Sequence, residues 1–215
     1  ENPFAKAFIS RNLPEAALQH DAGGPKVYRG EDQVDDNQRM LENGYDMLGY
    51  SEFIAGPDLS PDLVMQQAKS IHADLALIYA KLAGEVPLSI KLQQMRDQAK
   101  DTSSSTSVAP AQTSYTYFTS YWAKLAPPVL GVHVMSPAED VASSGVQIIA
   151  VINGSPAARA GLRDGDILTQ IGDMPLKNPA NLTEAARMYA GQTVNVTLMR
   201  EGHSDQVQVA LNKRR

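Results

Sequence analysis

The residue types that most often carry enzyme chemistry are few and scattered in this chain. Its four histidines are His20, His72, His133 and His203, and they lie in four separate local contexts without the spacing of metal ligands. There is no cysteine, which excludes thiolate zinc sites, cysteine nucleophiles and disulfides. The histidines and the lack of cysteine therefore predict neither a metal site nor a cofactor.

A serine nucleophile would need a recognisable turn around it. The nearest segment is Asn153-Gly154-Ser155-Pro156, in which serine followed by proline is typical of a helix cap, and the chain has no G-x-S-x-G elbow. We therefore predict a protein that is not an enzyme.

An acidic cluster at Glu31, Asp32, Asp35 and Asp36 leaves two interpretations open. It is either a cation site or a solvated loop. Because the spacing of an EF-hand loop is absent, the solvated loop is favoured.

Composition narrows the function classes further. The chain has 215 residues, of which 43% are apolar and 20% charged, as in ordinary globular proteins, and its length favours two domains. The net charge of -5 argues against a nucleic-acid partner. No apolar run is long enough to span a bilayer. Because the chain starts at Glu1 rather than methionine, we expect a processed N-terminus and do not read the missing export signal as a cytoplasmic location.

The N-terminal half is predicted to be a small α+β domain over 41–126, preceded by an extended segment over 1–40. A strand over 48–54, a helix opened by Ser60-Pro61 and a strand over 75–82 suggest a βαβ unit. A flexible excursion is expected near 88–113, and its serine-rich tract at 103–107 should be the first site of limited proteolysis.

An aromatic strand is predicted over 115–124, just before the second domain. Alternation places Tyr115, Tyr117, Thr119 and Tyr121 on one face. Such a stripe is either a ligand platform or the face of a core strand, and the core strand is favoured.

We take Pro127-Pro128 as the domain boundary. After it, the sequence pattern predicts short secondary-structure elements separated by strong turns. Strands are predicted over 145–152, 166–172, 193–200 and 205–212, and helices over 156–162 and 180–190. The sequence in this region includes Leu130-Gly131-Val132 and GSPAARAGLRDGDIL from residue 154. It resembles a PDZ domain of the bacterial type found in HtrA-type proteases, over about 128–212. The resemblance implies a partly open β-barrel with two helices.

The resemblance also implies a peptide-binding site. The amides of Leu130, Gly131 and Val132 would meet a peptide's terminal carboxylate, and the edge strand through His133 and Val134 would pair with its backbone by β-augmentation. On this interpretation Gly131 lacks a side chain to leave room for the carboxylate, so Gly131→Val should weaken peptide binding and leave the domain folded. The alternative is that Gly131 belongs to a strand that enters a tightly packed sheet.

The second predicted helix would form the other wall of that site, although simple core packing is an alternative for Leu182 and Ala186. Because it does not begin with histidine, apolar C-termini are the expected ligands. The proposed wall consists of Leu182, Ala185, Ala186 and Tyr189.

The segments GYDMLGYSEFIAG, QAKSIHADLALIYAK and YTYFTSYWAK are similar to a module that precedes PDZ domains in bacterial cell-envelope proteins, some of them lipoproteins. The resulting hypothesis is an exported, non-catalytic scaffold that binds protein or peptide C-termini, with membrane attachment only through a lipid anchor upstream of residue 1. The alternatives are a component of a secretion or envelope complex and a partner that presents substrates to a separate periplasmic protease.

Overall fold

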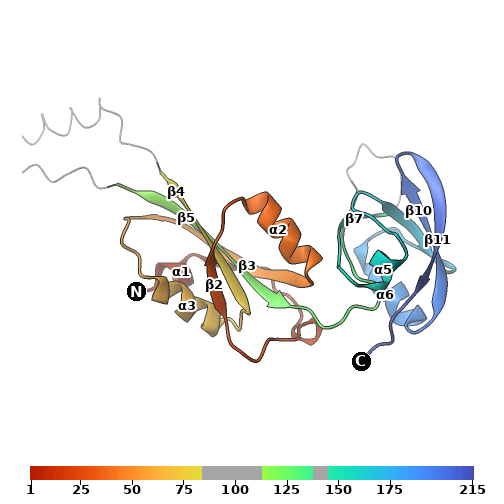
Figure 1. Ribbon diagram of the computed structural model, residues 1–215, viewed down its shortest axis with the longest axis horizontal. Helices are drawn as coiled ribbons and strands as arrows, with labels where there is room; N and C mark the ends of the chain where they lie inside the picture. Colours follow the sequence, from red (N-terminus) through yellow and green to blue (C-terminus); the bar gives the residue numbers. More distant parts are fainter. Residues whose placement is uncertain (84–112, 138–144) are drawn as a thin grey trace, which may run out of the picture. The chain divides into compact units, whose positions relative to one another are not determined.

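The computed structural model describes residues 1–83, 113–137 and 145–215, which form two compact units (Figure 1). The first unit consists of residues 1–13, 20–31 and 47–123, and the second of residues 14–19, 32–46 and 124–215. The second unit thus contains the segment after Pro127-Pro128 together with two pieces of the N-terminal half. The predicted excursion near 88–113 lies almost wholly outside the described residues, and the serine tract at 103–107 lies fully outside them. None of the described helices has both the length and the apolar character needed to cross a bilayer.

The first unit is built on a five-stranded sheet with β5 in its centre. The strand order is β1-β3-β5-β4-β2, with β2 parallel to β4 and β4 antiparallel to β5. The strands are β1 (Phe8–Ser10), β2 (Lys26–Arg29), β3 (Tyr45–Ala55), β4 (Leu75–Leu82) and β5 (Tyr115–Lys124). The predicted strands are confirmed, but β3 and β4 do not pair, because β5 lies between them.

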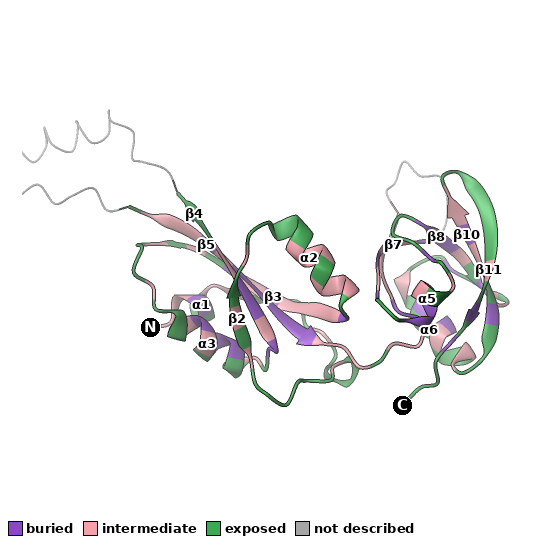
Figure 2. Ribbon diagram, viewed as in Figure 1, coloured by how far each residue is buried: buried purple, intermediate pink, exposed green. Residues whose placement is uncertain are grey.

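Two helices pack on this sheet and close the core of the first unit. They are α1 (Pro3–Lys6) and α3 (Pro61–Ser70), and Ser60 caps α3 by accepting a hydrogen bond from Asp62 N, as predicted. Phe4 of α1, Val64 and Ala68 of α3 and Tyr121 of β5 are buried together in this core. Figure 2 shows the buried stretches of α1 and α3. Since Tyr117 and Thr119 are also buried, the structure supports the core interpretation of the aromatic strand.

A buried carboxylate organises the loop that enters β2. Asp74 is 6% exposed, accepts a hydrogen bond from Asp21 N at 2.9 Å and lies 3.3 Å from His20 Nδ1. His20 and Asp74 therefore hold loop backbone in place. We assign this pair to architecture.

Tyr121 makes the stability of the first unit sensitive to alkaline pH. Ser51 Oγ donates to Phe4 O, so the Tyr121 hydroxyl donates to Ser51 Oγ, and burial raises the pKa of Tyr121 to about 12. Because the neutral phenol is favoured in the folded state, its stabilisation is complete below pH 10 and is lost as the pH rises from 10 to 12. Urea unfolding followed by Trp122 fluorescence should show about 1.4 kcal/mol of this loss between pH 9 and pH 11.

The matched control for this prediction is Tyr121→Phe. The difference in unfolding free energy between the two proteins should shrink by the same amount over that pH range. A difference that stays constant from pH 9 to pH 11 would contradict the prediction.

The second unit has its own sheet and its own core. Its strand order is β11-β10-β8-β7-β6, and β9 (Met174–Pro175) pairs with β8. The helices predicted after Pro127-Pro128 are both present, as α5 (Pro156–Arg159) and α6 (Pro179–Tyr189). The other strands are β6 (Val132–Met135), β7 (Val146–Val151), β8 (Ile167–Ile171), β10 (Thr193–Arg200) and β11 (His203–Ala210). This mixture of helices and sheets agrees with the predicted α+β class.

The expectation of a loop-like segment over 1–40 is wrong. That stretch contains α1, β1, β2, the 3-10 turn Glu15–Ala17 and most of α2 (Gln33–Glu42). The acidic cluster begins this helix rather than forming a loop, because Asp32 is its N-cap and accepts a hydrogen bond from Asp35 N. The helix escaped prediction because it has few apolar residues and none of them is buried.

Candidate functional site

A cavity of about 500 Å³ opens in the second unit, where the loop before β6 faces α6. This volume lies within the range of ligand-binding clefts. Most of the lining is apolar and comes from the loop and from α6. The lining residues are Ala17, Asp46, Leu125, Ala126, Pro127, Pro128, Val129, Leu130, Gly131, Val132, His133, Ile152, Leu182, Thr183, Ala186, Arg187 and Arg214.

The loop turns its carbonyl groups toward the body of the domain. Val129 O accepts from Asn212 N at 3.0 Å, Leu130 O accepts from Ala157 N at 2.9 Å, and Gly131 O accepts from Ile152 N at 2.9 Å. In a trans peptide the N–H of the next residue points to the side opposite the carbonyl. The amides of Leu130, Gly131 and Val132 therefore point away from these partners.

Two of these amides are left for a ligand. Within the described residues, no hydrogen bond is recorded from Leu130 N or Gly131 N. Leu130 is only 4% exposed, and buried amides need an acceptor. The geometry thus provides adjacent donors of the kind that hold an anionic oxygen.

Gly131 is required by the protein itself, which corrects the interpretation made from sequence. Its φ is +96°, and a Cβ at this position would overlap the side chain of Ser155. Ser155 caps α5 by accepting from Ala158 N, and its hydroxyl also donates to Gly131 O. The residue that excludes a side chain at Gly131 is therefore Ser155, and Gly131→Val would disturb the fold as well as binding.

The strand β6 leaves the loop as the last strand of its sheet. It pairs with β7 in antiparallel register, Val132 opposite Val151, with a bulge between His133 and Val134. Val132 and His133 line the cavity, whereas Val134 packs partly against the core. The sheet order places no strand on the other edge of β6 in the described part of the chain, so this edge has the geometry for adding a strand.

The helix α6 contributes a different set of residues from the one predicted. Leu182 and Ala186 line the cavity as expected, and Thr183 and Arg187 join them. Ala185 is fully buried in the core instead.

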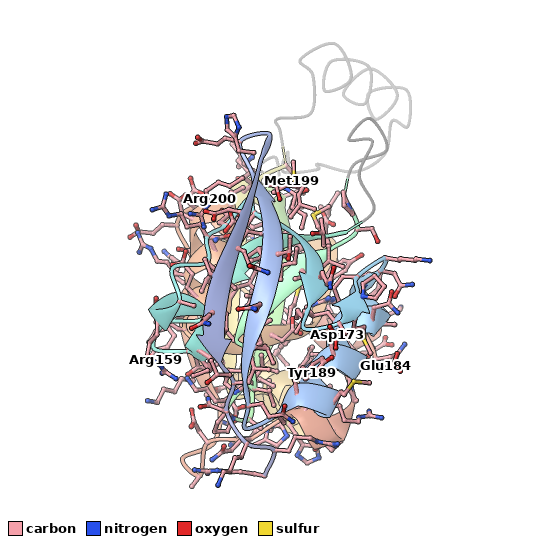
Figure 3. All side chains as sticks on the ribbon, turned by 90° about the vertical axis from the view of Figure 1, so that its right-hand side faces the viewer. Arg159, Asp173, Glu184, Tyr189, Met199 and Arg200 are labelled. Atoms are coloured by element: carbon pink, nitrogen blue, oxygen red, sulfur yellow. The ribbon has the colours of Figure 1, made fainter. Side chains whose placement is uncertain are left out.

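Tyr189 also lies outside the cavity lining. Its hydroxyl accepts a hydrogen bond from Asp173 N at 3.1 Å at the turn after β8 (Figure 3). The wall predicted on α6 therefore included two residues, Ala185 and Tyr189, that do not line the cavity. The sequence alone does not distinguish the helix face toward the sheet from the face toward the cavity.

The sequence analysis also missed α2, which packs against β6 and β7. Gln38 Nε2 donates to Ile149 O at 3.1 Å, beside the bulge, and Asn153 N donates to Glu42 O at 2.8 Å. His133 Nε2 lies 3.0 Å from Leu41 O, and since a carbonyl only accepts, the ring must donate. The strand with the free edge thus contacts a helix that ends 90 residues before it in sequence.

Metal chemistry finds no support at this site. The ranges that the structure describes contain no group of three or more His, Asp or Glu side chains arranged to hold a metal ion. The donors at the cavity are backbone amides and two arginines, which suit an anion.

Comparison with known proteins identifies this region. Residues 128–211 match the family model described as PDZ domain. The "Probable periplasmic serine endoprotease DegP-like" of Rhizobium meliloti is 32% identical over 90 residues, which cover 38% of this chain and 18% of that protein. The "Serine protease Do-like HtrA" of Lactococcus lactis subsp. lactis is 38% identical over 72 residues, covering 33% of this chain and 18% of that protein.

Solved structures give a weaker likeness. The HtrA3 PDZ domain bound to a phage-derived ligand has a TM-score of 0.36 and 22% identity, covering 40% of this chain and 85% of that one. The HtrA-type protease AlgW with a decapeptide has a TM-score of 0.37 and 20% identity, covering 45% of this chain and 37% of that one. The second unit thus contains a PDZ domain with HtrA-type relatives, while this chain spans less than a fifth of the curated proteases that it matches.

Proposed function

We propose that this protein is a non-catalytic peptide-binding protein of the bacterial cell envelope, which captures protein C-termini in the cavity between β6 and α6. The observation that carries the proposal is the loop at 129–132, whose carbonyls are bonded inward and whose amides at Leu130 and Gly131 are left as donors. A peptide adding to the free edge of β6 would place its terminal carboxylate at these amides.

The lining of the cavity supports apolar residues at the ligand's C-terminus. Val129, Ile152, Leu182 and Ala186 supply aliphatic surface beside the loop. Burial of one aliphatic side chain there stabilises a complex by about 1.5–3 kcal/mol. We therefore expect C-terminal Val, Leu or Ile to be preferred over charged residues.

The matched relatives support the envelope location and the non-catalytic role. A matched relative is described as periplasmic, which favours an exported protein. The similarity to proteases covers 18% of their length and falls on the PDZ region, which favours a binding role over a catalytic one. A role in presenting substrates to a separate protease fits the same site.

A free carboxylate should be decisive for binding. A library of fluorescein-labelled heptapeptides with randomised last four residues and free C-termini is screened against the full chain by fluorescence anisotropy. The tightest binder is then resynthesised as its C-terminal amide. Because the peptide amide keeps an acceptor oxygen but lacks the charge, we expect affinity to fall by about 100-fold, equivalent to about 1.4 kcal/mol of lost charge assistance in each of two hydrogen bonds.

The two ways in which this proposal can fail are distinct. Equal affinity of the acid and the amide would show that the loop does not bind the carboxylate. Absence of any binder in the library would contradict peptide capture by this cavity.

A further inference from the structure

The charged residues around the cavity lie outside the loop at 129–132, whose amides would bind the carboxylate. Segment 125–133 carries no arginine, lysine or acidic residue, and Pro127-Pro128 stand just before the loop amides. The formal charges in the cavity lining are those of Arg187, Arg214 and Asp46. Their sum is positive, so the cavity as a whole favours an anion.

Arg214 is held close to the loop by its neighbours in sequence. Asn212 N donates to Val129 O at 3.0 Å, and Asn212 Nδ2 donates to Pro128 O at 3.0 Å. These two bonds fix the chain end, two residues before Arg214, against the residues that lead into Leu130. A C-terminal segment that looks like a basic tail in the sequence is thereby part of the cavity wall.

Arg187 reaches the cavity from the opposite side. It lies in the last turn of α6, directly after Ala186 and one turn beyond Thr183, both of which line the cavity. For neither Arg187 nor Arg214 does any hydrogen bond or ion pair appear among the residues that the structure describes. Both guanidinium groups are therefore available to a ligand.

Residues 125–128, which precede the loop, have no backbone N–H to offer to a ligand strand. Leu125 N donates to Gly44 O and Ala126 N donates to Ala17 O, each within 3.0 Å, while Pro127 and Pro128 have no N–H. A ligand strand that follows β6 toward the loop therefore finds its last backbone donors at Leu130 and Val129. A ligand strand that extends further would gain no additional backbone hydrogen bonds.

We propose that Arg187 and Arg214 form, with the loop amides, a composite anion site that selects free C-termini over internal extended segments. This inference rests on the proposed function and names its ligand class. The amides supply oriented dipoles, and the two arginines supply the full charge that the loop itself lacks. Asp46, on the same cavity, opposes them and sets the net charge near +1.

The expected magnitude is modest because both arginines are exposed. An exposed charge pair contributes about 0.2–1 kcal/mol, which corresponds to about 1.4- to 5-fold in affinity for each arginine. The contribution should also fall with salt, since the screening length shrinks from about 10 Å at 0.1 M to about 3 Å at 1 M.

The test compares the library-selected heptapeptide as acid and as amide, on the full chain, in Arg187→Gln, Arg214→Gln and the double variant. We expect the double variant to bind the acid about tenfold more weakly at low salt and the amide unchanged, so that the ratio of the two affinities falls by the same factor. Arg187→Lys with Arg214→Lys keeps the charge and should preserve the ratio within about twofold.

Arg163→Gln is the matched control, because Arg163 is exposed in the same unit and does not line the cavity. It should leave the ratio unchanged. Equal loss of acid and amide binding in the double variant, no loss at all, or the same loss in Arg163→Gln would each overturn the inference. All three outcomes require a wild-type protein that binds the peptide, so they are distinct from failure of the proposed function itself.

Discussion

Gly131→Ala should destabilise the second unit by about 3–5 kcal/mol. The added Cβ meets the side chain of Ser155, which is 4% exposed and fixed by its bonds to Ala158 N and Gly131 O. A left-handed backbone at φ +96° adds about 1–2 kcal/mol of its own for any residue with a side chain. The remainder comes from overpacking a site with no room to relax.

The effect can be measured by calorimetry on the full chain. Trp122, the only tryptophan, is buried in the first unit, so a thermal transition without a change in its fluorescence belongs to the second unit. For a loss of this size, the melting temperature of that transition should fall by more than 10 °C, at about 4–8 °C per kcal/mol. An unchanged transition would show that Gly131 is not constrained by Ser155.

Two companion variants separate the backbone cost from the steric cost. Gly154 has φ +71° and open space where a Cβ would lie, so Gly154→Ala should lose only about 1–2 kcal/mol. Ser155→Gly removes the obstructing side chain, and glycine replaces serine as an N-cap at a cost of a few tenths of a kcal/mol. Gly131→Ala should therefore cost less in the Ser155→Gly background, and strict additivity of the two changes would rule out the proposed contact.

The sequence predicted most strands and helices after Pro127-Pro128 well because local chemistry specifies them. Ser155-Pro156 caps and opens α5, and Gly165 and Asp166 form the turn into β8, where Asp166 accepts from Arg163 N. The alternation over β10 and β11 is equally local, since the two strands form a hairpin from Thr193 opposite Ala210 to Arg200 opposite His203. Signals of this kind lie within a few residues of each other.

The composition of the candidate site was less predictable because it depends on long-range packing. Asp46 and Ala17 reach the cavity from segments more than 80 residues before Leu130, and no periodicity reports such a contact. Arg214 reaches it only because Asn212 bonds to the loop. The contact that requires a glycine at position 131 was missed for the same reason, since Ser155 lies 24 residues away in sequence.

Arg200→Met should cost the second unit about 3–5 kcal/mol, because it would leave a buried charge without its partner. Asp166 is 2% exposed and accepts from Arg200 Nε at 2.8 Å and from Arg200 Nη2 at 2.7 Å. The hydrogen bonds to Asp166 raise the pKa of Arg200, so the arginine stays charged throughout the accessible range. Without it, the Asp166 carboxylate would keep one recorded donor, Arg163 N, and its desolvation would go largely uncompensated.

Arg200 also connects three segments of the second unit, so the stability of this unit depends on the geometry of the guanidinium group. Besides its bonds to Asp166 just before β8, Arg200 Nη2 donates to Gly161 O at 3.0 Å, so the end of β10 is tied to the segment after α5. Lysine cannot make the paired bonds of a guanidinium, and Arg200→Lys should therefore lose about 1–2 kcal/mol rather than nothing.

Removing both charges distinguishes an ion pair from mere packing. Asp166→Asn keeps the shape of the side chain and the hydrogen bond from Arg163 N. In that single variant the Arg200 side chain, which is 25% exposed, can be solvated by water. The double variant Asp166→Asn with Arg200→Met should then be more stable than Arg200→Met alone, because no buried charge remains. The second-unit transition in calorimetry of the full chain gives the comparison, and a double variant less stable than Arg200→Met would mean that the carboxylate has a structural role independent of its partner.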